Sequence, residues 1–316
     1  MRAPRRALSL AALGVFALAC GKEAPVARLE VQPQALTLGY PDVQELHLAW
    51  EPEAALDPAG GTPTVFVHLL DRRGRIVRTY DHLFPRPWQE GTPVAYDVKV
   101  FQSGLVSPLP PGSYTLSLGL YDNRNGRRWP LDVAAPDLKR HEYRVAQVQV
   151  PAKRRGPRFS FAGPWLPSEP GGSRQVLARR WLDGPGVLRV QGLSGAGSLW
   201  LVIKIPAGDG PGEKLVFDSP ANTPSVVVSA SCSGGMETGI SGAGSREIEI
   251  PADATPADGR CEIHLRPNFH LRRVGIPGAR SIALENVAWI PAGAGATPDE
   301  SAVPDEPGSP TAPALP

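Results

Sequence analysis

The chain has 316 residues, with 33 Lys and Arg against 31 Asp and Glu, and this near balance excludes the strongly basic surface that binds nucleic acid. Its 34 Gly and 36 Pro are well above the usual share, while the apolar content is an ordinary 41%. The combination predicts many short strands joined by Gly and Pro turns, in a chain long enough for two domains.

The N-terminus has the features of an export signal. Arg2, Arg5 and Arg6 precede an uncharged stretch, residues 7–19, that is too short to span a bilayer and has the length of a signal-peptide h-region. The stretch ends in "ALAC" at Cys20. This ending resembles a bacterial lipobox, in which the cysteine after the cleavage site carries diacylglycerol.

The lipobox interpretation divides the N-terminus into a signal peptide, residues 1–19, and a lipidated tether, residues 20–27, whose acyl chains at Cys20 would make the lipid bilayer a partner. Gly21 follows the cysteine instead of an aspartate, which in similar lipoproteins favours the outer over the inner membrane. An ordinary signal peptide with an incidental Cys20 is the alternative. Removal of the signal leaves 30 of the 33 basic residues against 31 acids.

Strand signals follow one another closely over residues 28–150. "RLEVQPQALTLG" and "VQELHLAW" alternate apolar and polar residues, and "TVFVHLL" is typical of a buried strand. "DRRGR" and "NRNGRR" supply hairpin turns. No amphipathic helix of useful length is apparent. The pattern predicts an immunoglobulin-like β-sandwich.

Three motifs in this region occur in a recognisable order: "VFVHLLDRRGRIV", "WQEGTPVAYDV" and "PLPPGSYTLSLGLYDNRNGRRWPL". Over residues 45–135 the chain resembles the soluble C-terminal β-sandwich module of bacterial membrane glycosyltransferases of the dolichyl-phosphate-mannose type. The matching positions are Phe66, His68, Asp71, Gly74, Trp88, Gly91, Asp97, Pro111, Gly112, Tyr114, Gly119, Tyr121, Asp122, Gly126 and Arg128. The resemblance implies a sandwich fold and no catalytic role.

Two of the motif residues have structural explanations. His68 shares a strand face with Phe66 and Leu70, so we expect a satisfied core or rim group and not a ligand-binding side chain. Tyr114 follows a Pro–Gly turn, where the tyrosine corner of a sandwich bonds its hydroxyl to nearby backbone.

The second half of the chain has three parts. Residues 151–172 are expected to be a linker, whose basic residues either touch anionic lipid headgroups or are simply solvated. Residues 173–292 contain further strand signals, including "SLWLVIKIP", and predict a second β-sandwich of the jelly-roll or galactose-binding-like kind. Residues 293–316 carry four acids and no base and are expected to be disordered. The predicted fold class is therefore all-β, with two sandwiches in tandem.

Two cysteines remain if Cys20 is acylated. Cys232 and Cys261 lie in the second domain of an exported chain, which predicts one disulfide, the alternative being two unpaired buried thiols. Their spacing, without nearby paired histidines, matches no zinc site. We expect no metal and no cofactor.

No catalytic signature is present. The serines of "GLSGAG", "SCSGG" and "GISGAGS" do not fit a nucleophile elbow, and "GDGPGE" lacks the spacing of a phosphate loop. We expect a non-catalytic envelope protein with no nucleic-acid partner. Two hypotheses remain, namely binding of carbohydrate or surface polymer, and structural binding of another envelope protein through a sheet edge.

Aromatic exposure separates the two hypotheses, because sugar rings stack on open aromatic faces. Trp88, Trp129 and Trp165 stand beside turn or linker residues and are the candidate ligand-binding residues. Arg127 and Arg128 directly precede Trp129 and supply possible donors. The alternative for Trp129 is that it caps the sandwich core. Three other tryptophans lie on apolar strands and are expected in the core: Trp181, Trp200 and Trp289.

Overall fold

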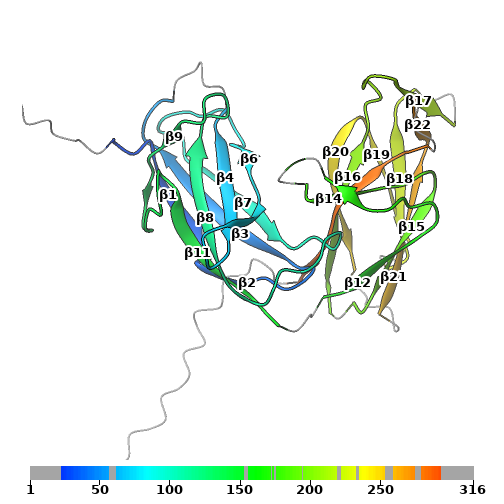
Figure 1. Ribbon diagram of the computed structural model, residues 1–316, viewed down its shortest axis with the longest axis horizontal. Coiled ribbons are helices and arrows are strands. Elements are labelled where there is room, and N and C mark those ends of the chain that lie inside the picture. The colour runs from blue at the N-terminus through cyan, green and yellow to red at the C-terminus, as the bar shows by residue number, and fades with distance from the viewer. Residues whose placement is uncertain are drawn as a thin grey trace, which may run out of the picture.

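The computed structural model describes residues 23–56, 62–152, 156–171, 173, 176–193, 195–218, 222–232, 235–252, 259–274 and 279–292. These residues form strands and turns, and none of them belongs to a helix long and apolar enough to cross a membrane. They fold into two β-sandwiches that lie side by side (Figure 1). The predicted all-β fold class is confirmed. Cys20, the predicted signal peptide and the predicted tail from Gly293 lie outside the described residues.

The first sandwich contains one sheet in the order β10-β1-β3-β7 and another in the order β2-β11-β8-β4-β5, with β6 beside β4 and β9 beside β8. The chain crosses between the sheets from β1 to β2, and the remaining strands follow the distribution of an immunoglobulin-like domain. The strands are β1 (Ala27–Gln32), β2 (Ala35–Thr37), β3 (Val43–Pro52), β4 (Thr64–Leu70), β5 (Ile76–Thr79), β6 (His82–Leu83), β7 (Val94–Phe101), β8 (Gly112–Tyr121), β9 (Arg128–Trp129), β10 (Asp132–Val133) and β11 (Tyr143–Val150).

Local sequence explains much of this sandwich. The strict alternation of burial along β1 follows the apolar–polar alternation of its sequence. The tyrosine corner is present, since the Tyr114 hydroxyl donates to the Pro110 carbonyl at 2.7 Å. Every residue of β4 is buried, because Arg128 covers Phe66, and Asp81 and Glu142 cover His68, on its outer face. A Cβ at Gly119 would lie 2.5 Å from the His141 carbonyl oxygen, so only glycine permits this close approach.

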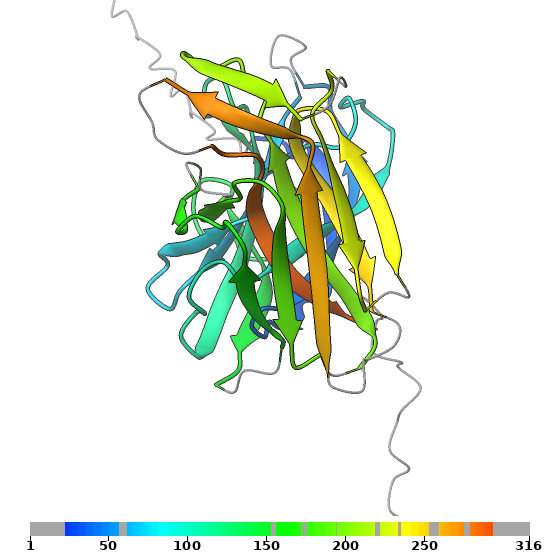
Figure 2. The ribbon, with the colours of Figure 1, turned by 90° about the vertical axis from the view of Figure 1, so that its right-hand side faces the viewer.

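The second sandwich contains sheets in the orders β12-β15-β21-β18-β19 and β13-β14-β23-β16-β20, with β17 and β22 forming a separate hairpin. Figure 2 shows the first of these sheets in front, with the first sandwich behind it. The strands are β12 (Arg158–Ala162), β13 (Glu169–Pro170), β14 (Ala178–Trp181), β15 (Gly186–Gln191), β16 (Gly197–Ile205), β17 (Glu213–Phe217), β18 (Ser225–Ala230), β19 (Met236–Ser241), β20 (Gly244–Pro251), β21 (Arg260–Pro267), β22 (Phe269–Arg273) and β23 (Ala283–Pro291).

The order of these strands is that of a jelly roll. Eight of them, β14, β15, β16, β18, β19, β20, β21 and β23, pass back and forth between the two sheets along the chain. The resulting neighbours, β14-β23-β16-β20 and β15-β21-β18-β19, are those of two interlocked Greek keys.

The segment expected to be a linker contributes to this sandwich. β12 pairs with β15 over all five of its residues, and Phe159 and Phe161 pack against the second core. β13 pairs with β14. The alternation in "RFSFA" is a strand signal, but the Gly and Pro residues around it obscured it.

A disulfide joins Cys232 to Cys261, with a Cα–Cα distance of 5.0 Å, which confirms the predicted pairing. The bond connects the end of the β18 segment to the start of β21, its neighbour in the sheet. Both cysteines belong to the buried core of the second sandwich.

The two sandwiches are joined by backbone hydrogen bonds and by side-chain packing. The Trp289 amide donates to the Pro41 carbonyl at 2.8 Å, and the Gly104 amide donates to the Val287 carbonyl at 2.7 Å. Beside these bonds, the rings of Phe101 and Trp200 meet edge to face at 4.8 Å.

We predict that the disulfide is a main contributor to the stability of the second sandwich. Its cysteines are 29 residues apart, so the chain-entropy model gives a contribution of about 3–4 kcal/mol. The variant Cys232→Ser/Cys261→Ser should therefore unfold at a clearly lower denaturant concentration than the unreduced wild type. Equal midpoints for the two proteins would contradict this.

Candidate functional site

The two sandwiches enclose a cleft of about 510 Å³. On the first sandwich its wall comes from β7 and from the β5–β6 segment, and on the second from β16, β20 and β23. Figure 1 shows β16 and β20 on the side of the second sandwich that faces the first. The wall carries aromatic and polar side chains from both sandwiches, together with Val202: Thr79, Tyr80, Asp81, His82, Tyr96, Asp97, Lys99, Phe101, Trp200, Ser245, Glu247, Glu285 and Asn286.

A β-bulge places two polar residues in the wall of the cleft. The pairing of β23 with β16 shifts between Val202 and Ile203, opposite Glu285 and Asn286. Consecutive residues of a regular strand point to opposite faces, but Glu285 and Asn286 both line the cleft. Bulges redirect side chains in this way and are common beside functional sites.

Two buried side chains in this wall lack hydrogen-bond partners. Asn286 is only 3% exposed and Thr79 only 6%. Neither the amide nitrogen nor the amide oxygen of Asn286 has a partner among the described residues, and the Thr79 hydroxyl likewise has none there. An unsatisfied buried polar group costs about 1–3 kcal/mol. Both residues belong to the lining of the cleft.

The edge of β7 offers further backbone groups. Among the strands that the structure describes, β7 pairs only with β3, so it is an edge strand. The Gln102 amide bonds toward β3, to Asp42, whereas the Phe101 carbonyl points to the other side, where it accepts from the Tyr80 hydroxyl at 2.8 Å. By alternation, the backbone N–H and C=O of Asp97 and Lys99 face the open edge beside the cleft.

The charges of the cleft are mainly negative. The carboxylates of Glu45, Asp81, Asp97, Glu247 and Glu285 line it together with a single lysine. That lysine, Lys99, bridges the sandwiches, with its ammonium 2.8 Å from Glu249 and 3.6 Å from Glu247. The Glu285 carboxylate is held by the Arg179 guanidinium and by the Ser245 hydroxyl, each at 2.6 Å. An anionic polymer would meet repulsion here.

His82 is fixed as a neutral imidazole in the same wall. Its Nδ1 lies 3.0 Å from the Tyr80 carbonyl, and because a carbonyl only accepts, Nδ1 carries the proton. Nε2 then accepts from the Tyr96 hydroxyl at 2.9 Å. Burial lowers the pKa of His82 and raises the pKa of Tyr96. Both side chains are therefore uncharged hydrogen-bonding groups at neutral pH.

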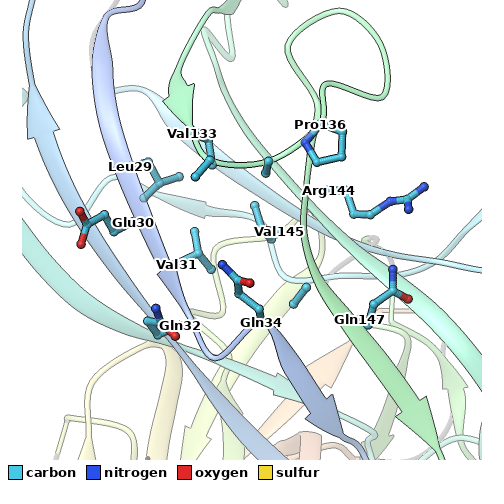
Figure 3. Close-up of a pocket in the computed structure, with 13 residues that line it drawn as sticks. Leu29, Glu30, Val31, Gln32, Gln34, Val133, Pro136, Arg144, Val145 and Gln147 are labelled. Atoms are coloured by element: carbon cyan, nitrogen blue, oxygen red, sulfur yellow. The ribbon is translucent and has the colours of Figure 1, made fainter.

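A second hollow lies at the side of the first sandwich, where β1 gives way to β2. It measures about 490 Å³ and lies between β1 and β11. Figure 3 shows Leu29, Val31 and Val145 between the two strands, with Glu30 and Arg144 at its margins. None of its lining residues appears among the buried side-chain atoms that lack partners. Its lining combines eight apolar residues with Glu30, Gln32, Gln34, Arg144 and Gln147.

The three tryptophans expected to bind ligand do not form a common surface, and none of them lines the cleft. Trp129 is only 6% exposed and belongs to the first core, so the expectation of an open ring was wrong there. Its strand β9 pairs with β8, and alternation turns Trp129 inward and Arg128 outward, over the Phe66 ring at 4.4 Å. This arrangement corresponds to the alternative in which Trp129 caps the core.

Trp88 and Trp165 are half-buried and hydrogen-bonded to backbone. The Trp88 indole donates to the Ala54 carbonyl at 3.0 Å, and its ring packs against Trp50. The Trp165 indole donates to Val187 at 3.2 Å, and its ring packs against Phe161. Trp181, Trp200 and Trp289 are buried as expected.

His68 belongs to a buried polar cluster that meets the cleft wall at Asp81. Its Nε2 lies 3.3 Å from the Asp81 carboxylate, and its Nδ1 lies 3.8 Å from that of Glu142. Glu142 also accepts from the Ser117 hydroxyl at 2.8 Å and pairs with Arg128 at 3.2 Å. The expected structural role of His68 fits this geometry.

The cluster sets the protonation of its members. Burial opposes the charged imidazole, but hydrogen bonds and charge from Asp81 and Glu142 outweigh it and raise the pKa of His68. The His68 imidazole, the Ser117 hydroxyl and the Arg128 guanidinium lower the pKa of Glu142 to about 2, against the effect of burial.

The residues of the cleft do not form a pattern in the sequence. The wall of the cleft combines strands that are far apart in the chain. One signal was present, since the polar pair Glu285–Asn286 interrupts the apolar strand "IALENVAWIP". Among the described residues, no group of three or more His, Cys, Asp or Glu side chains is placed to hold a metal ion.

The sequence matches no family model and no curated protein. Among solved structures, one match is a family GH115 4-O-methyl-alpha-glucuronidase with specificity for decorated arabinogalactans, at 11% identity and a TM-score of 0.27, covering 48% of this chain and 20% of that chain. Another is SGBP-B of the Bacteroides ovatus mixed-linkage glucan utilization locus in complex with a mixed-linkage heptasaccharide, at 8% identity and a TM-score of 0.21, covering 82% and 52%.

A third match, described as pT26-6p, has 8% identity and a TM-score of 0.22, and covers 85% of this chain and 65% of that chain. This chain thus spans less than two thirds of the length of each of the three proteins. Likenesses at these TM-scores assign no function to it.

We predict that His68 makes stability depend on pH. The pKa of His68 is higher in the folded protein than its value of 6.5 in the unfolded chain. Protonated His68 therefore stabilises the fold fully below pH 6.5, and this stabilisation is lost as the pH rises through the folded-state pKa. The free energy of unfolding of the wild type should therefore fall more between about pH 6 and pH 9 than that of His68→Gln. Denaturant titrations at several pH values measure this difference.

The matched control is His264→Gln, because His264 is an exposed histidine on β21. This variant should keep the pH dependence of the wild type. If His68→Gln also kept it, the assigned charge of His68 would be wrong.

Proposed function

We propose that this chain is a non-catalytic cell-envelope lipoprotein that binds a carbohydrate in the cleft between its two sandwiches. The observation that carries the proposal is the β23 bulge, which places Asn286 in the cleft wall with its amide nitrogen and oxygen both unpartnered. A sugar offers hydroxyls that donate and accept at neighbouring positions, and a primary amide matches both.

The remaining wall supports the same ligand class. Tyr96 and Phe101 supply apolar ring surface for the C–H faces of a sugar. The open edge of β7 adds backbone donors and acceptors, and the Thr79 hydroxyl adds a further polar group. A concave wall that combines aromatic rings with polar groups is typical of small-ligand sites. The excess of carboxylates favours an uncharged glycan over a polyanion.

The lipoprotein part of the proposal rests on the "ALAC" sequence at Cys20. An acyl anchor there would hold the chain at the envelope, with the outer membrane favoured by Gly21. The alternative function, binding of another envelope protein, would use the groove between β1 and β11 (Figure 3).

We predict that Asn286→Ala lowers carbohydrate affinity by about tenfold or more, because it removes hydrogen bonds worth about 1–3 kcal/mol. The same change should leave the free energy of unfolding unchanged or raise it, since it removes an unsatisfied buried amide. Binding of a panel of neutral and acidic envelope polysaccharides, measured by calorimetry, and denaturant unfolding check both effects.

The matched control is Asn123→Ala, which changes an exposed asparagine on the β8–β9 turn and should affect neither quantity. Absence of wild-type binding across the panel, together with co-purification of a defined envelope protein, would replace this proposal with the partner-binding function. Hydrolysis of a bound glycan would contradict a non-catalytic role.

We also predict that Cys20→Ser releases the protein from the membrane fraction. One acyl chain binds a bilayer only marginally, whereas two or more hold it stably, and the substitution removes the thiol on which the anchor is built. Cell fractionation followed by immunoblotting measures the distribution. A variant that stays in the membrane pellet to the same extent as the wild type would contradict the anchor.

A further inference from the structure

A third hollow lies on the same face of the second sandwich as the cleft. It measures about 490 Å³ and is lined from β14, β16 and β22 and from the loops beside the β17–β22 hairpin. Its polar lining contains Glu169, Arg179, Lys204, Asp209, Glu213, Arg273 and Arg280, and the Trp181 ring completes it.

This hollow adjoins the cleft. Val202 lines the cleft and Lys204 lines the hollow, and the two residues stand on one face of β16, about 7 Å apart. Glu285 of the cleft bonds to Arg179 of the hollow at 2.6 Å and 3.1 Å. The Glu285 side chain is only 4% exposed. The Arg179–Glu285 ion pair is therefore largely buried, with one partner in the lining of each hollow.

Lys204 is the cation of the hollow that remains available. Arg179 pairs with Glu285, Arg273 with Glu213 at 3.1 Å, and Arg280 with Glu169 at 3.3 Å. Lys204 has no carboxylate within 4 Å among the described residues. Its half-buried ammonium therefore has donors to offer a bound molecule.

We infer that the two hollows form one groove that holds an extended, uncharged polysaccharide segment running from Asn286 to a second subsite at Lys204. This inference rests on the proposed function and adds the length and charge of the ligand. Asn286 pairs with Val202, and Lys204 lies about 7 Å further along β16, so a ligand that contacts both subsites spans at least that distance. Four cations face three carboxylates in the far hollow, which leaves little net charge to select a polyanion.

The two subsites should respond differently to ligand length. A short oligosaccharide occupies the cleft alone, because the cleft supplies the unpartnered amide and the ring surfaces. A longer chain also reaches Lys204 and gains its hydrogen bonds. Asn286 therefore acts on ligands of every length, whereas Lys204 acts only on long ones.

The test uses the mature chain and a length series prepared from whichever neutral polysaccharide of a panel of β-glucan, mannan, galactan and dextran binds the wild type. Affinities are measured by calorimetry for the wild type, Lys204→Gln and Asn286→Ala. Lys214→Gln is the matched control, because Lys214 is an exposed lysine on β17 outside the hollow's lining.

Wild-type affinity should rise with chain length and then level off. Lys204→Gln should remove several-fold of the affinity for long chains and leave that for the shortest binding oligomer unchanged, while Asn286→Ala weakens all of them. An affinity that is independent of length, or a Lys204→Gln loss that is equal at every length, would overturn the groove and leave the cleft proposal standing. If no carbohydrate bound, both proposals would fall.

Discussion

The junction between the sandwiches is the constraint on which the candidate site depends. Two backbone hydrogen bonds, from Trp289 to Pro41 and from Gly104 to Val287, connect the last strand of the second sandwich to loops of the first. The Phe101–Trp200 contact and the Lys99 ion pairs lie next to them. Because backbone groups hold the junction, the spacing of the two walls is set by the fold itself.

The junction also explains the position of Trp200. Its ring projects from the outer face of its sheet, where it would be open to solvent in an isolated sandwich. Contact with Val43 and Phe101 of the first sandwich leaves it only 3% exposed. Phe101 and Trp200, whose rings join the two sandwiches, also line the cleft. The apolar junction and the wall of the site therefore share residues.

Features that arise from neighbouring residues were predictable from sequence. Alternation of apolar and polar residues along the strands predicted the all-β class. The Pro–Gly turn before Tyr114 predicted the tyrosine corner, and two cysteines in an exported chain predicted the disulfide. These predictions rest on local spacing or on export to an oxidising compartment, so they did not require the tertiary fold.

The site depends on relations that sequence spacing does not contain. Trp129 lies beside turn residues, yet pairing of β9 with β8 turns it inward. The bulge that redirects Asn286 arises from the pairing of two strands about 80 residues apart in the chain. At Trp129, tertiary pairing and not the local pattern therefore decides that the ring is buried.

The most direct test of this account is whether the cleft has one fixed width. Spin labels on Arg73→Cys, in the β4–β5 turn, and Glu237→Cys, on β19, would report the distance between the sandwiches in a Cys20→Ser background. The account predicts a single narrow distance distribution for the ligand-free protein. A broad or multiple distribution would contradict it, because the walls of the cleft would then not be held in place before a ligand binds.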